Sequence, residues 1–75
     1  MNYTYTDVEA AREAVEVAIN DTIGDNPELT EDVIYRDMVQ SIMYDCDPAT
    51  AKELGRITGV DMVDKHRRIG LVHDE

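Results

Sequence analysis

The sequence predicts a small all-α domain of three or four helices, and three observations lead to that prediction. Apolar residues recur at the three- and four-residue spacing of a helix face. Residues that begin helices and residues that end them alternate along the chain at short intervals. The chain has 75 residues, which suffice for one domain, residues 1–75, with a small core.

The first helix is expected over about residues 6–23. Thr6 and Glu9, in the segment TDVE, have the spacing of a capping box, in which two side chains bond to each other's backbone amides. Gly24 is expected to end the helix, because glycine adopts the left-handed conformation without strain. The predicted inward face consists of apolar and small residues: Val8, Ala11, Val15, Ala18, Ile19, Thr22 and Ile23.

The second helix is expected over residues 31–44. It follows the loop DNPEL, and Thr30 is its predicted N-cap. Glu31 and Asp32 lie in the first turn, where carboxylates interact favourably with the helix dipole. The predicted inward face is Val33, Ile34, Met38, Ile42 and Met43, with Tyr35 and Tyr44 at its edges.

The third helix is expected over residues 48–58. Asp47 followed by Pro48 is a typical helix start, an N-cap and then a first-turn proline. Gly59 is expected to end this helix. The predicted inward residues are Ala51, Leu54 and Ile57.

A short fourth helix is expected over residues 62–69, capped by Asp61 and closed by Gly70. Its predicted inward residues are Met62, His66 and Ile69. On its outer face, acids and bases pair at i, i+4 spacing, Asp61 with Lys65 and Asp64 with Arg68. The last five residues, LVHDE, are either a short strand or a tail.

Charge is the strongest compositional feature of the chain. Seventeen Asp and Glu residues face seven Lys and Arg residues, for a formal net charge of -10, and Phe and Trp are absent. Residues 1–51 hold twelve of the acids and two of the bases, whereas residues 52–75 hold five of each. The acidic excess and the lean core resemble proteins of salt-loving archaea, in which molar salt screens carboxylates from one another. The alternative is an ordinary acidic interaction domain.

The stretch TAKELGRITGVDMVDKHRRIGLV, residues 50–72, resembles the DNA-binding unit of prokaryotic helix-turn-helix and winged-helix regulators. The matching residues are apolar Leu54, small Gly55, the turn glycine Gly59 and apolar Val60. The resemblance implies a DNA-binding regulator that uses residues 50–69 and places its second helix in the major groove. By position, it implies base contacts from Lys65, Arg67 and Arg68, and phosphate contacts from Lys52 and Arg56.

Three features depart from the pattern of that family. The chain is shorter between Val60 and Lys65, Thr58 stands where an apolar residue is common, and a second wing strand has no room. The acid–base pairs of the fourth helix neutralise bases that DNA would need, and affinity from phosphate contacts falls steeply with salt. A plain helical hairpin is therefore the alternative structure for this stretch.

The function that we expect is protein interaction or dimerisation, without catalysis. A core this small leaves apolar residues that one chain covers poorly, and a homodimer or a protein partner would cover them. The predicted interaction residues are Tyr35, Met38, Met43 and Tyr44. DNA binding is the alternative, and a third hypothesis is a DNA mimic whose carboxylates occupy a nucleic-acid-binding protein.

The sequence contains no pattern typical of an enzyme, a cofactor site, a metal site or a small-molecule site. Cys46 is the single cysteine, which excludes paired-cysteine metal sites, and we expect it to be a part-buried residue between helices. There is no nucleophile–base pair at informative spacing and no Gly-rich phosphate loop. No apolar run approaches the roughly 20 residues that span a bilayer, so we expect a cytoplasmic protein.

Overall fold

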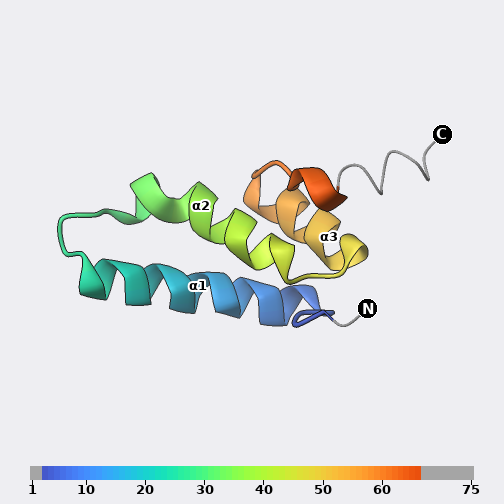
Figure 1. The fold of residues 1–75 in the computed structure, drawn as a ribbon, viewed down its shortest axis with the longest axis horizontal. Coiled ribbons are helices and arrows are strands. Elements are labelled where there is room, and N and C mark those ends of the chain that lie inside the picture. The colour runs from blue at the N-terminus through green and yellow to red at the C-terminus, as the bar shows by residue number, and fades with distance from the viewer. Residues whose placement is uncertain (1–2, 67–75) are drawn as a thin grey trace.

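The computed structural model describes residues 3–66 and shows an all-α fold (Figure 1). Its helices are α1 (Val8–Asp25), α2 (Glu31–Tyr44) and α3 (Pro48–Thr58). A further helical turn begins at residue 64 and reaches the end of the described range. Within residues 3–66, strand-like pairing is limited to an isolated parallel bridge between Tyr5 and Cys46. The predicted fold class is therefore confirmed.

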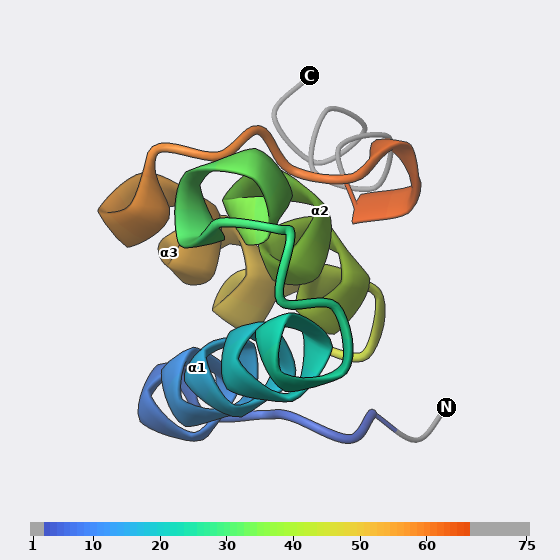
Figure 2. The same cartoon turned by 90° about the vertical axis from the view of Figure 1, so that its left-hand side faces the viewer.

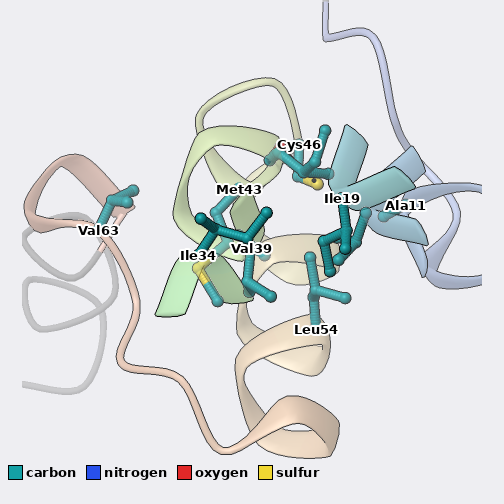
Figure 3. Close-up of a cluster of buried hydrophobic side chains, with 11 residues drawn as sticks. Ala11, Ile19, Ile34, Val39, Met43, Cys46, Leu54 and Val63 are labelled. Atoms are coloured by element: carbon teal, nitrogen blue, oxygen red, sulfur yellow. Dashed lines mark hydrogen bonds between the residues drawn. The ribbon is translucent and has the colours of Figure 1, made fainter. Parts of the chain in front are cut away.

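The helices pack as an antiparallel pair with a third helix against it. α1 and α2 run in opposite directions, and α3 contacts both of them (Figure 1). Figure 2 looks along the pair and shows the three helices at the corners of a triangle, with the chain after α3 returning across α2. Their apolar faces meet in one core (Figure 3), which consists of Ala11, Val15, Ile19, Ile34, Val39, Ile42, Met43, Cys46, Ala51, Leu54 and Val63.

The first helix begins at Val8, two residues later than predicted. Asp7 is its N-cap and forms no side-chain capping bond, so the predicted capping box of Thr6 and Glu9 is wrong. The chain just before is held extended, because Tyr5 N donates a hydrogen bond to the carbonyl of residue 45 and Tyr5 O accepts one from the amide of residue 47. The predicted stripe is confirmed, since its members are buried or half-buried: Val8, Ala11, Val15, Ala18, Ile19, Thr22 and Ile23.

The first helix also ends later than predicted, at Asp25, so that Gly24 lies inside it. Asn26 explains the difference, because its backbone amide donates to Thr22 O and Ile23 O, and its Nδ2 also donates to Thr22 O. These bonds satisfy carbonyls that a helix end leaves without partners. A glycine within a helix costs only about 1 kcal/mol relative to alanine, so the helix continues through Gly24.

The inward face of α2 is rotated from the predicted one. Val33 is 67% exposed, which contradicts the prediction, whereas Val39 is fully buried although it was not predicted. The other predicted positions are buried or half-buried, namely Ile34, Met38, Ile42 and Met43. The helix packs against both α1 and α3, so its buried stripe has two neighbours to face rather than one.

α3 has the ends that the sequence predicted. Asp47 is the N-cap, and its Oδ1 accepts a hydrogen bond from the amide of residue 50 at 3.3 Å. Gly59 follows the helix in the left-handed conformation, at φ 76°. Ala51 and Leu54 are fully buried as predicted, but Ile57 is 40% exposed. Ile57 lies at the side of a stripe formed by positions 50, 51, 54 and 58, so the prediction for it is wrong.

The fourth helical segment starts at residue 64 rather than at 62, so Asp61 is not its cap. Residues 60–63 are instead used to cross from α3 to the end of α2. Val63 is buried although it was not predicted, and its carbonyl accepts a bond from His66 N at 3.0 Å. His66 is fully buried as predicted, and Met62 is half-buried. Ile69, Gly70 and the predicted strand or tail lie outside the described residues.

Candidate interaction groove

The turn after α3 is packed tightly against α2. A Cβ atom on Gly55 would lie 2.9 Å from Val60 O and 3.2 Å from Met43 Cε, so this position requires glycine unless its neighbours move. Thr58 Oγ1 donates to the carbonyl of residue 54 at 2.7 Å and accepts from Val60 N at 3.3 Å. A hydroxyl at position 58 thus holds the turn, which explains a threonine where the helix-turn-helix pattern prefers an apolar residue.

Two of the predicted DNA-contacting bases are engaged within the chain. Arg56 forms an exposed ion pair with Glu53, which lowers the pKa of the Glu53 carboxyl. Lys65 Nζ donates to Tyr44 O at 3.0 Å and lies 5.5 Å from the centroid of the Tyr44 ring. A lysine at this place also interacts favourably with the C-terminal dipole of α2. Lys52 is exposed on α3, and Arg67 and Arg68 lie outside the described residues.

The four predicted interaction residues do not form one surface. Met43 is fully buried, and Gly55 and His66 cover it, since His66 Nε2 lies 2.8 Å from Met43 O and donates to it. Met43 is therefore a core residue, and its assignment to a surface is corrected. Tyr35 and Met38 are half-buried against the core, and Tyr44 is 52% exposed with Lys65 over its ring.

A groove opens where α3 ends. α3 has 11 residues whereas α1 has 18, and the ends of α1 and α2 near their connecting loop extend beyond α3 (Figure 1). The groove has a volume of about 250 Å³. Its floor consists of Val15, Ile19, Tyr35 and Leu54, and its rim consists of Arg12, Glu16, Glu31 and Thr58.

Carboxylates predominate around this groove. A second cleft of about 270 Å³ adjoins it and is lined by Glu16, Ile19, Asn20 and Glu31, so it holds a carboxylate from α1 and one from α2. Arg12 lies one turn before Glu16 on α1 and shares a further cleft with Glu9, Glu13 and Glu16. Among residues 3–66, neither Arg12 nor these two carboxylates form an intrachain ion pair. The rim charges are therefore available to a partner.

The sequence predictions did not identify this groove. Val15, Ile19 and Leu54 were predicted to face inward, which they do, and nothing in helical spacing distinguishes a covered core residue from one at a groove floor. The sequence feature that could have indicated the groove is the unequal length of the helices. The α3 stop at Gly59 comes early, and it leaves part of the α1–α2 pair without a third helix.

The reactive side chains of the described range are buried and lie apart from the groove. Cys46 is fully buried, and its Sγ donates to Ile42 O at 3.3 Å. Burial, together with the nearby Asp47 and Asp45 carboxylates, raises the pKa of this thiol to about 11. His66 Nδ1 is buried and has no hydrogen-bond partner in residues 3–66. No group of three or more His, Cys, Asp or Glu side chains with metal-binding geometry occurs in that range.

None of the helices in the described part of the chain has the length and apolar character needed to cross a membrane.

Comparison with known proteins adds no family to these observations. The resemblance to helix-turn-helix regulators rests on the residues around the α3 turn. Searches against protein-family models, curated proteins and solved structures gave no match to this chain.

Proposed function

We propose that this chain is a non-catalytic protein-interaction module that binds its partner in the groove between α1, α2 and the last turn of α3. The observation that carries the proposal is the combination of an apolar floor with rim charges that have no intrachain ion pair. Protein interfaces commonly combine an apolar centre with a polar rim. The floor of the groove is also held in place, because Val15, Ile19 and Leu54 belong to the core.

Photo-crosslinking at the groove tests this proposal. A photoreactive phenylalanine analogue replaces Tyr35, which lines the groove, and in a matched protein it replaces Val33, which is exposed and outward on the same helix. We expect irradiation of cells that express the protein to join position 35, but not position 33, to a defined partner. Equal labelling from both positions, or none from position 35 in a chain with native circular dichroism, would overturn the proposal.

Self-association through the groove stays a prediction alongside a different protein partner. A second copy would cover the same apolar floor, although two chains of net charge -10 repel each other unless salt screens them. Light scattering in molar KCl measures this directly. A dimer mass that returns to the monomer mass as salt is lowered would show that the chain self-associates when salt screens its charge.

DNA binding through residues 50–69 is the second candidate function. The observation that supports it is the α3 turn, where Gly55 packs closely against Val60 O and Gly59 has a positive φ. The contacts of Arg56 and Lys65 within the chain weaken it. Duplex DNA is added to isotope-labelled protein while salt is lowered stepwise. Amide shift changes confined to residues 52–68 would support DNA binding, and an unchanged spectrum would exclude it.

A further inference from the structure

We infer that the partner of the groove is a basic protein segment that places one apolar side chain on the floor and a lysine or arginine between Glu16 and Glu31. This inference rests on the proposed function, because it names the class of partner for the same groove. The floor, the two carboxylates and the net charge of the chain support it.

The groove has room for a side chain rather than for a drug-sized ligand. The volume of the whole groove is about 250 Å³, which falls below the roughly 300–1,000 Å³ that pockets for drug-sized ligands occupy. Leu54, Ile19 and Val15 are held by the core, so the site is formed before a partner arrives. Burial of an aliphatic or aromatic side chain there would remove its apolar surface from water, which favours binding. The floor therefore selects an apolar anchor.

The two carboxylates select a cation next to that anchor. Glu16 and Glu31 are exposed, and they come from different helices to flank Ile19 in the adjoining cleft. Either one can accept hydrogen bonds from a guanidinium or an ammonium group, and such charge-assisted bonds are stronger than neutral ones. A partner segment with a lysine or arginine close to its apolar anchor can therefore contact the floor and the two carboxylates at the same time.

Overall charge favours a basic partner over a second copy of the chain. The chain carries a net charge of -10, with twelve acids in residues 1–51, which include α1 and α2. Complementary charge steers association, and like charge opposes it. Arg12 does not make its end of the groove basic, because it shares a cleft with Glu9, Glu13 and Glu16.

Two synthetic helical peptides test the class of partner. They share a leucine face, and they differ in having lysine or glutamate at every flanking position. Binding is measured by calorimetry at the lowest salt at which the protein stays folded, and the site is read from amide NMR shifts. We expect the lysine peptide to bind at least about tenfold more tightly than the glutamate peptide, and to shift Val15, Ile19, Tyr35 and Leu54.

Paired charge variants separate the groove from general attraction to an acidic protein. The double variant E16Q/E31Q removes two carboxylates at the groove, and D21N/D37N removes two exposed ones that line neither cleft. We expect the first pair to weaken the lysine peptide about tenfold and the second pair less than about twofold. Equal losses from both pairs would overturn the inference, since the attraction would then be diffuse.

The outcomes also distinguish this inference from the proposed function. Binding of the glutamate peptide in the groove with equal or greater affinity overturns the basic class but leaves the interaction module in place. Groove amides that respond to neither peptide also overturn the inference, while crosslinking from position 35 independently decides whether the groove holds a protein. Failure of both experiments removes the module as well.

Discussion

The α3 segment, residues 47–60, and the groove beside its end differ in how much of their chemistry is satisfied within the chain. In the α3 segment, Asp47 caps the helix, and Gly55 packs closely against Val60 O. The Thr58 hydroxyl donates one hydrogen bond and accepts another within the same turn. In the groove, Tyr35 is only half-buried, and the rim charges of Arg12, Glu16 and Glu31 form no ion pair within residues 3–66. Both features follow from one local event, because the stop of α3 at Gly59 completes the tight segment and leaves the groove open.

Leu54 belongs to both regions, so its truncation should destabilise the protein more than any other change considered below. Leu54→Ala removes a fully buried side chain from the core and enlarges the groove floor. Loss of buried contacts and the cavity left behind predict destabilisation by about 2–5 kcal/mol, measured by denaturant unfolding followed by circular dichroism. Ile57→Ala on the same helix is the control, because Ile57 is 40% exposed. Equal losses from both variants would contradict the assigned core.

The second prediction tests how tightly the α3 turn is packed. Gly55→Ala places a methyl group 2.9 Å from Val60 O, and this overpacking predicts a loss of about 1–3 kcal/mol in the free energy of unfolding. Gly24→Ala is the matched control, because Gly24 lies inside α1 with no atom within 4 Å of the added Cβ. Better helix propensity predicts that this control stabilises the protein by up to about 1 kcal/mol. The opposite signs are the readout, and a stabilising Gly55→Ala would reject the close packing.

The sequence predicted these features best where stereochemistry leaves few choices. Asp47–Pro48 and Gly59 delimit α3 as expected, because a proline in the first turn and a left-handed glycine have few other uses. The prediction that Gly24 ends the first helix is wrong. A helix tolerates a glycine when a later residue, here Asn26, bonds to the carbonyls of its last turn. On α2, helical spacing alone leaves the rotation of the buried face undetermined, so the sequence predicts Val33 as inward and does not identify Val39. The packing of two neighbouring helices decided between them.

The candidate site was less predictable than the fold, for a physical reason. Exposed basic residues near a helical turn suggested DNA contacts, but a sequence does not show that Arg56 bonds to Glu53 or that Lys65 bonds to Tyr44 O. Met43 was placed on a surface because the return of residues 60–66 over α2 was not foreseen. A groove depends on where one helix ends relative to two others, which is a tertiary property.

The third prediction concerns the thiol that precedes the α3 segment. Because burial raises the pKa of Cys46 from 9.0 to about 11, the folded state retains this proton more strongly than the unfolded state. The stabilisation is complete below pH 9.0 and is lost as pH rises through about 11, with a total of about 3 kcal/mol. Unfolding free energies measured across this range should fall more steeply for the wild type than for Cys46→Ala. Parallel curves for the two proteins would show that Cys46 is not desolvated.

The smallest expected effect distinguishes a cation used within the chain from one left free. Lys65→Ala removes the bond to Tyr44 O and the favourable charge at the end of α2, and should cost less than about 1 kcal/mol, since Lys65 is exposed. Lys52→Ala, on the exposed face of α3, should change stability by less than about 0.5 kcal/mol. Thermal unfolding of both variants at one salt concentration measures the difference. If the two variants change stability equally, the contact of Lys65 with the end of α2 contributes nothing to stability, and its charge is available for the DNA-binding alternative.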